Sequence, residues 1–285
     1  MHGVPASGQG WLRDIPDFRD FDPSTPTVRE AMARLKRRRS RQSAPPPTID
    51  LSEFLPEPLP SSSQRQTTAR GIAALVQTFE RRATGRVLDL SPEFLDYAAQ
   101  RLEERPADGG VSLRAMLKAL ARFGCPPRRF GPNVDTADGV GEPSTLAFGY
   151  QRDFAGLQYF RLDPPGVSGA EVLKRVKGFL AAGFPLVCGS ALPGAPATDG
   201  DLAYPTKHDA IGLATSLVVV GYDDRRRIRS SHGALTVQTS LGPNFGEAGR
   251  ARLPYRFIES GLACDFWTLL KPDWIATGEF EQPVA

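Results

Sequence analysis

The feature of this sequence that most constrains its fold is a change of apolar periodicity at about residue 159. Before that point, apolar side chains recur at helical spacing in segments 69–82, 92–104 and 112–123. After it, one helical segment at 168–182 precedes short apolar runs that favour strands, at 185–191, 217–222, 234–239 and 263–270. Helices first and strands later are typical of an α+β protein, here with two lobes.

The boundaries of the predicted helices follow from capping residues. Ser91 precedes a proline and a glutamate, which is a typical helix start, and Ser112 repeats this logic before a helix that Gly124 ends. Thr67 or Thr68 is placed to cap the helix over 69–82. Residues 133–150 and 193–212 are rich in glycine and polar residues, so we expect them to form loops.

Residues 1–48 are expected to be an N-terminal arm or linker rather than a domain. A short helix is predicted over 27–39, followed by three prolines at 45–47 that stiffen the chain. The basic run at 36–41 could contact phosphate or an acidic partner, but a solvated helix end explains it as well. The arm could dock on its own domain, cover a cleft or reach a neighbouring molecule, and residues 276–285 form a C-terminal tail.

The composition excludes several classes of function. Three cysteines lie far apart and three histidines are available, so we expect no disulfide framework, no metal site and no cofactor. The net charge of +3 comes mostly from arginine and argues against nucleic acid as the partner. No apolar run reaches the ~18–20 residues of a membrane helix. The amino terminus lacks a signal peptide, so a cytoplasmic location is expected, with no membrane association.

The remaining cysteines and histidines offer weak candidates for catalysis. Cys188 lies within an apolar run, and Cys125 and Cys264 are also expected to be small buried side chains. His208 lies in a long loop that could carry it toward a cleft, but a solvated pair with Asp209 is the simpler interpretation. His232, in a polar turn, has no evident role.

Five segments in the same order resemble the papain-like (C1 family) cysteine peptidases, especially their bacterial single-chain members. These are Asp50-Leu-Ser-Glu-Phe-Leu-Pro, Leu90-Ser-Pro-Glu-Phe-Leu-Asp-Tyr, Gly109-Gly-Val-Ser-Leu-Arg-Ala-Met-Leu-Lys, Leu217-Val-Val-Val-Gly-Tyr and Gly242-Pro-Asn-Phe-Gly-Glu-Ala-Gly. The resemblance runs from about Trp11 to Leu270. It implies a papain-like domain over 49–275, with a helical left lobe over about 50–158. The right lobe, over about 159–275, would be antiparallel and β-barrel-like.

The resemblance also implies where catalytic residues would stand, and this chain departs from the family at each position. The nucleophilic cysteine falls on Thr67, which is followed by Thr68, and the histidine falls on Thr215. The asparagine falls on Thr239 and the oxyanion glutamine on Ser61. A threonine hydroxyl without a base is a poor nucleophile. The resemblance therefore implies a papain-like scaffold without catalytic residues.

Three functions are compatible with such a scaffold. In the first, Thr67, Thr68, Thr215 and Thr239 line a groove that binds a peptide or protein segment without cutting it. In the second, the groove is filled and the protein is an adaptor or structural component. The alternative from another class is an active cysteine-type peptidase or hydrolase with a non-standard nucleophile. A peptide or protein partner is expected, and the sequence leaves the oligomeric state open.

Overall fold

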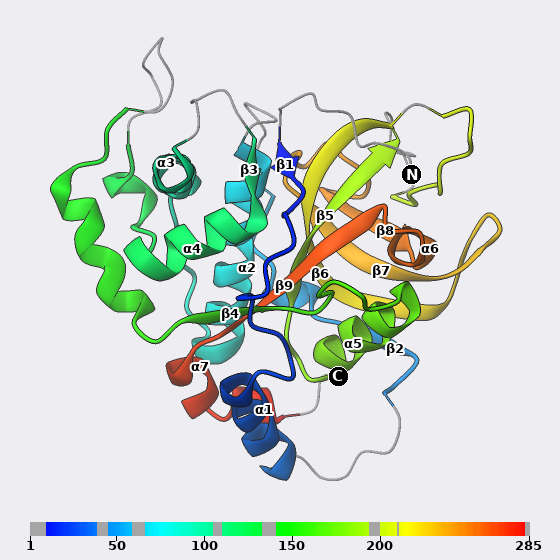
Figure 1. The fold of residues 1–285 in the computed structure, drawn as a ribbon, viewed down its shortest axis with the longest axis horizontal. Helices are drawn as coiled ribbons and strands as arrows, with labels where there is room; N and C mark the ends of the chain where they lie inside the picture. The colour runs from blue at the N-terminus through cyan, green and yellow to red at the C-terminus, as the bar shows by residue number, and fades with distance from the viewer. Residues whose placement is uncertain are drawn as a thin grey trace.

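Helices cover one side of a long twisted sheet. The computed structural model describes residues 10–38, 45–58, 66–104, 110–132, 141–193, 200–209 and 211–282. In Figure 1, helices α2, α3 and α4 lie on one side of the molecule and the sheet lies on the other, with α5 and α6 against it. The helices are α1 (Pro26–Arg38), α2 (Thr67–Thr84), α3 (Pro92–Glu103), α4 (Leu113–Phe123), α5 (Gly169–Ala181), α6 (Arg256–Glu259) and α7 (Pro272–Ala276). We call α2–α4 the helical half and the sheet with α5 and α6 the sheet half.

The large sheet has seven strands and is antiparallel. Its strands are β2 (Thr48–Asp50), β4 (Gln158–Arg161), β5 (Leu186–Pro193), β6 (Ile211–Ile228), β7 (Ser231–Thr239), β8 (Arg250–Pro254) and β9 (Ala263–Leu270). They are hydrogen-bonded in the order β4-β9-β5-β6-β7-β8, and β2 pairs with β6. The expected α+β class is confirmed. Among the described strands, however, the sheet is an open path with β4 and β8 at its ends, so it does not close into a barrel.

Local capping chemistry sets most of the helix boundaries. The Ser91 hydroxyl accepts a hydrogen bond from Phe94 N at 3.2 Å, and the Ser112 hydroxyl accepts one from Ala115 N at 3.2 Å. Gly124, with a φ of 71°, ends α4 in a conformation that favours glycine. The expected threonine cap of α2 is wrong. The cap residue is Gln66, whose side chain makes no capping hydrogen bond.

The structure differs from the predicted elements where strand pairing, rather than the local pattern, decides. β6 extends over 211–228, well beyond the predicted 217–222, because β5, β2 and β7 pair along its length. Short strands β2, β4 and β8 were not predicted, since each carries too few residues for a clear alternation. Residues 145–150, within the loop expected over 133–150, belong to a 3₁₀ segment over 145–154.

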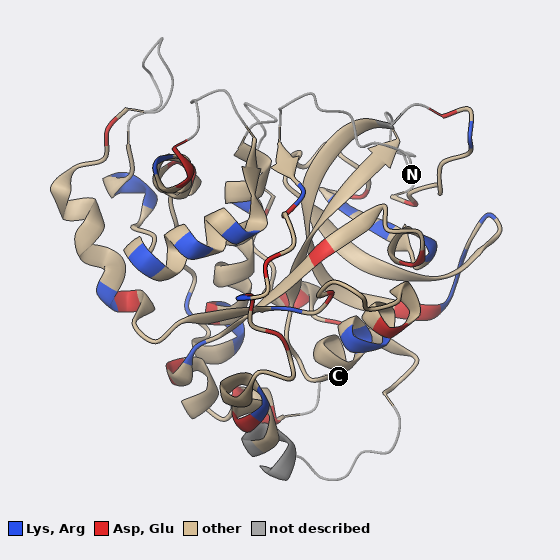
Figure 2. Cartoon of the chain, in the orientation of Figure 1, with Lys and Arg blue, Asp and Glu red and all other residues tan. Residues whose placement is uncertain are grey.

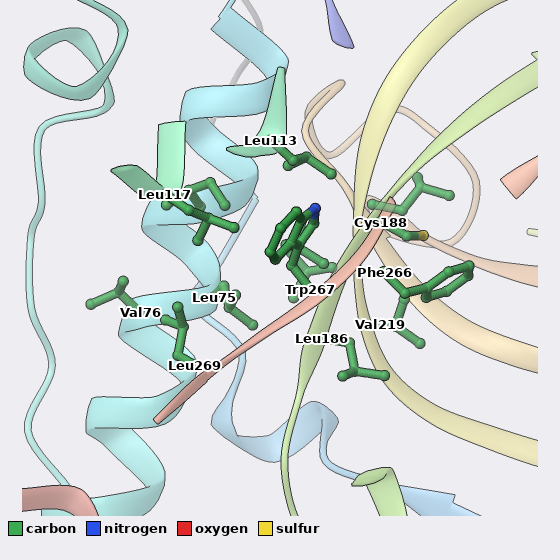
Figure 3. Close-up of a cluster of buried hydrophobic side chains, with 14 of the residues drawn as sticks. Leu75, Val76, Leu113, Leu117, Leu186, Cys188, Val219, Phe266, Trp267 and Leu269 are labelled. Atoms are coloured by element: carbon green, nitrogen blue, oxygen red, sulfur yellow. The ribbon is translucent and has the colours of Figure 1, made fainter. Parts of the chain in front are cut away.

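A single core joins the two halves. Trp267 on β9 is fully buried, and Figure 3 shows its indole between Leu113 and Leu117 of α4 and Cys188 and Leu186 of β5. The buried apolar side chains form one continuous cluster that contains residues of both the helices and the sheet. No helix among the described residues is long and apolar enough to cross a membrane. The helices and the sheet therefore share their hydrophobic interior, and this positions the start of α2 against the sheet.

Candidate functional site

Three segments far apart in the sequence meet at the amino-terminal end of α2. Thr67 is the first residue of this helix, Thr215 lies in β6, and Thr239 ends β7. The Ser216 hydroxyl donates a hydrogen bond to the Thr67 carbonyl oxygen at 2.8 Å. Thr239 is the register partner of Leu217 in the β6–β7 ladder. The structure thus brings together the helix start and the two strand positions that the sequence comparison singled out.

Gly71 explains how the helix approaches the two strands so closely. A Cβ atom at Gly71 would lie 2.5 Å from the Ser216 hydroxyl oxygen and 3.6 Å from that of Ser240. Gly71 lies one turn after Thr67, on the same face of α2. Because a contact of 2.5 Å is too short for a methyl group, a side chain at Gly71 would require either a rotation of the Ser216 hydroxyl, with loss of its bond to the Thr67 carbonyl oxygen, or a shift of α2. The glycine therefore fixes the distance between the helix start and the strands.

The hydroxyl groups at this site are all buried. Thr67 and Thr215 have no exposed surface, and Thr68 and Thr239 are 1% and 2% exposed. Among the described residues, the hydroxyls of Thr67 and Thr68 have no hydrogen-bond partner. The hydroxyl of Thr215 contacts the Ser216 carbonyl oxygen at 3.4 Å, and that of Thr239 contacts the Gly249 carbonyl oxygen at 3.3 Å. None of these contacts involves a base that could take a proton from a hydroxyl. Ser61 lies outside the described residues.

The cysteines and described histidines lie apart from these threonines or are chemically unsuited to join them. Cys188 on β5 is fully buried, and burial raises the pKa of its thiol well above the ordinary value. Burial also raises the pKa of Cys125 and Cys264, so the predicted role of all three as buried apolar side chains is confirmed. His208 and His232 are exposed on the surface of the sheet half. No group of residues suited to hold a metal ion occurs in the described ranges.

The described part of the N-terminal arm lies at the junction between the two halves. Its strand β1 (Trp11–Leu12) pairs in parallel with β3 (Val111–Ser112), the segment that leads into α4. Trp11 is 2% exposed, and a Cβ atom at Gly189 of β5 would lie 1.9 Å from its Cε2 atom. Figure 1 shows β1 passing between the helical half and strands β5 and β6. Among the open alternatives, the arm therefore docks on its own domain. The basic run at 36–41 lies outside the residues whose side chains are described.

Two aspartates lock the docked arm to β9. The indole Nε1 of Trp11 and the backbone N–H of Asp14 donate to the Asp265 carboxylate at 3.2 Å and 2.8 Å. In return, Trp267 Nε1 donates to Asp14 Oδ2 at 2.9 Å. Asp265 has a left-handed backbone with a φ of 57°, which is unusual for a residue other than glycine. These reciprocal hydrogen bonds between the arm and β9 hold the Trp11 indole in its buried position.

Arg161 is the cation that makes this burial of carboxylates possible. Its guanidinium lies 2.5 Å from Asp265 Oδ1 and 3.0 Å from Asp163 Oδ1, and its side chain is 7% exposed. Burial and the neighbouring charge of Asp14 raise the pKa of Asp265 to about 7. Burial opposes the charge of Arg161, but Asp163 and Asp265 outweigh it and raise the pKa of Arg161. Sequence reasoning missed this network, because it joins three segments, at residues 14, 161–163 and 265, that lie more than a hundred residues apart and share no motif.

A small cavity lies beside the threonine site. It is bounded by α2, the end of β7 and the segment 56–58. Its polar lining includes Gln77, Gln238 and Ser240, next to Thr239. Gln238 donates through Nε2 to the Pro56 carbonyl oxygen at 3.1 Å, whereas its Oε1 has no partner among the described residues. The described lining also includes Thr239, the guanidinium of Arg70 and the carboxylate of Glu57, but no thiol or imidazole.

Valine substitutions test whether the hydroxyls at the start of α2 are without partners. Thr67→Val and Thr68→Val are each expected to raise the free energy of unfolding by about 1 kcal/mol, because a buried hydroxyl without a partner is replaced by a methyl group of similar shape. The matched control is Thr78→Val on the same helix, since the Thr78 hydroxyl donates to Ala74 O at 2.7 Å. Urea unfolding measures each change. A loss of stability in Thr67→Val as large as in the control would contradict the prediction.

Known proteins provide the comparison for this geometry. No family model and no curated protein sequence matches the chain. Among solved structures, xylellain, a cysteine protease from Xylella fastidiosa, is 25% identical with a TM-score of 0.71, and the match covers 94% of this chain and 98% of that one. The digestive procathepsin L2 proteinase of Tenebrio molitor is 12% identical, with a TM-score of 0.64 over 93% of this chain and 79% of that one. The clostridial cysteine protease Cwp84 is 16% identical, with a TM-score of 0.60 over 79% of this chain and 58% of that one. The chain therefore has the fold of the papain-like cysteine proteases.

Proposed function

We propose that this chain is a papain-like protein without peptidase activity, which serves as an adaptor or structural component. The observation that carries the proposal is the set of side chains where α2 meets β6 and β7. The segments that carry Thr67, Thr215 and Thr239 meet there, the hydroxyls of all three residues are buried, and none of the hydrogen bonds of the described residues joins them to a thiol or an imidazole. Hydrolysis by a papain-like site needs a thiolate that an adjacent imidazole activates.

The position of the arm supports the second part of the proposal. Trp11 fills the space against Gly189 at the junction of the two halves, and Asp14 anchors it through Asp265. An extended peptide that entered at this point would have to displace a buried indole and break a buried set of charged hydrogen bonds. A binding partner is therefore expected to use the outer surface of the protein rather than this junction.

An assay on the full chain tests the absence of activity. The purified protein is incubated with a library of quenched fluorescent peptides, and we expect no hydrolysis above that of buffer. Thr67→Ala and Cys188→Ala, each checked for an intact thermal transition, serve as controls for a contaminating peptidase. Cleavage that persists in both variants belongs to a contaminant. Cleavage that either substitution abolishes would overturn the proposal in favour of a hydrolase with a non-standard nucleophile.

Capture of library peptides tests the adaptor or structural role separately. The wild-type chain is expected to retain no peptide at the junction, and Trp11→Ala is the variant that removes the occupying side chain. Retention by the wild type that increases in Trp11→Ala would show that the junction is a peptide-binding groove. That result would overturn the proposed adaptor or structural role, but it would not be evidence of peptidase activity.

A further inference from the structure

The β6–β7 hairpin projects a group of arginines beyond the body of the sheet. Beyond Asp223, the register pairs Arg227 with His232 and Ile228 with Ser231, so Arg229 and Ser230 form the turn. Ile228 is buried, whereas Arg225, Arg227 and Arg229 are exposed. Figure 2 shows the hairpin protruding at the right of the molecule with basic residues at its tip and along one strand. The patch defined by these three arginines is called the arginine hairpin below.

Two carboxylates beside the arginine hairpin, those of Asp224 and Asp201, have other cations as partners. Asp224 is bonded by Lys177 Nζ at 2.7 Å and by the Tyr255 hydroxyl at 2.7 Å. Asp201 is bonded by a fourth arginine, Arg226, at 2.8 Å and 2.9 Å. Within the part of the chain that the structure describes, no ion pair joins Arg225, Arg227 or Arg229 to a carboxylate. Asp223 accepts from the backbone N–H of Arg225 at 2.8 Å, and the charge of Arg229 adds to the Thr206 hydrogen bonds that lower the pKa of Asp209. Most of the positive charge of the three guanidinium groups is therefore left for an external anion.

The conformation of the turn is unfavourable for arginine, and no hydrogen bond or ion pair of the Arg229 side chain with the described residues offsets this. Arg229 has a φ of 51°, in the left-handed region where glycine and asparagine are favoured. Its side chain is exposed and extends the row of Arg225 and Arg227. A residue with an unfavourable backbone conformation, whose guanidinium forms no hydrogen bond or ion pair with the described residues, points to a binding role.

We propose that the arginine hairpin binds an acidic segment of a partner protein. Guanidinium groups match carboxylates through paired hydrogen bonds, and three of them suit a peptide with several closely spaced Asp or Glu residues. Arg229 lies four residues after Arg225, so the row spans at most about 13 Å at ~3.3 Å per extended residue, and the register shift between Asp223 and Arg227 shortens it. This is short for a duplex contact, which commonly engages about 6–10 phosphates. No exposed aromatic side chain lies within 223–232 to stack on a nucleic-acid base.

This inference goes beyond the proposed function, because the hairpin lies away from the site at the start of α2. If the chain proved to cleave peptides at the threonine site, the proposal for the arginine hairpin would not be affected. If the hairpin proved to bind no acidic peptide, the proposal that the chain lacks peptidase activity would not be affected. The two proposals are therefore tested by separate measurements.

Binding of a labelled acidic peptide tests the proposal. Fluorescein-labelled octaglutamate is titrated with the full chain, with octaglutamine as the reference peptide, and anisotropy is measured at two salt concentrations. We expect octaglutamate to bind, and the affinity to fall with added salt. Combined Arg225→Gln, Arg227→Gln and Arg229→Gln should weaken it by roughly tenfold or more, since each 1.4 kcal/mol is tenfold. The matched control combines Arg101→Gln, Arg122→Gln and Arg129→Gln, which removes the same charge from exposed sites on the helical side.

Three outcomes would overturn the proposal. Octaglutamate that fails to bind excludes an acidic peptide as the ligand. An equal loss of affinity in both triple variants would show an effect of net charge alone. Tighter binding of oligothymidine or of phosphatidylserine vesicles, lost in the hairpin variant, would assign the surface to nucleic acid or membrane instead. Arg229→Gly gives a further check, because it should raise the midpoint of thermal unfolding while it weakens octaglutamate binding. A loss of both would show that Arg229 is structural.

Discussion

Replacing Trp11 with alanine is expected to lower the free energy of unfolding by about 3–5 kcal/mol, the range for large aromatic side chains removed from a core. Trp11 is 2% exposed and packs against Gly189 of β5. Its loss would leave a cavity at the junction of the two halves and remove a hydrogen-bond donor to Asp265. Urea unfolding, followed by circular dichroism, measures the change.

A second substitution shows whether this cost comes from the contact with Gly189. Gly189→Ala alone should destabilise the protein by about 1–3 kcal/mol, as overpacking does, since its Cβ would lie 1.9 Å from Trp11 Cε2. In the Trp11→Ala background the same change should cost far less, because the indole is gone. Equal costs in both backgrounds would contradict the docking of Trp11 on Gly189.

Arg161→Met is expected to be similarly damaging, by about 3–5 kcal/mol, because it leaves buried carboxylates without their cation. Arg161 lies 2.5 Å from Asp265 and 3.0 Å from Asp163, and 3.8 Å from Asp14 of the arm. Arg129→Met, at an exposed position on the helical side, is the matched control and should change stability little. Chemical denaturation at pH 7 measures both. A change in Arg161→Met no larger than in the control would show that the network contributes nothing.

The same network gives stability a pH dependence of defined sign. Asp265 faces Asp14, Asp163 and Arg161, and burial followed by the charge of Asp14 raises its pKa to about 7. An aspartate in the unfolded chain has a pKa of about 3.9, so between about pH 4 and pH 7 the folded state binds the additional proton. The contribution of Asp265 is therefore present at low pH and is lost as the pH rises through about 7.

Asp265→Asn isolates this contribution from those of other groups. Glu80 and Asp22, for example, have lowered pKa values and act in the opposite direction. We expect the stability of the wild type relative to Asp265→Asn to fall between pH 5 and pH 8. Between pH 5 and pH 8, the free energy of unfolding of Arg161→Met should fall more steeply than that of the wild type. The reason is that the buried carboxylates then ionise without a neighbouring cation. A difference that rises with pH would contradict the assigned direction.

The sequence predicted the parts of the fold that short-range chemistry decides. Ser91 and Ser112 cap their helices as expected, because a cap depends on backbone N–H groups three residues away. The strand at 263–270 is bounded as predicted, since its apolar residues are contiguous. The charged residues at 223–228 gave no strand pattern, yet they form the end of β6, because pairing with β7 compensates for poor local propensity.

The candidate site was predicted through family resemblance rather than through local pattern. Thr67, Thr215 and Thr239 are ordinary residues in isolation, and their segments meet because α2 packs on β6 through the contact between Ser216 and the Thr67 carbonyl oxygen. The docking of the arm could not be predicted, because Trp11 and Gly189 are in contact in the fold but far apart in the sequence. Likewise, Arg161 and Asp265 lie about a hundred residues apart, and the sequence gives no sign that their charges pair.

The shared core around Trp267 has a consequence for how this chain can be divided. Trp267 packs between helices α2 and α4 and strand β5, and its indole also bonds Asp14 of the arm. A fragment that ended between the helices and the sheet would expose this interior on both pieces. The arm, the helices and the sheet are therefore one cooperative unit of unfolding, so limited cleavage at the surface should leave the pieces associated and hydrogen exchange of their buried amides equally slow.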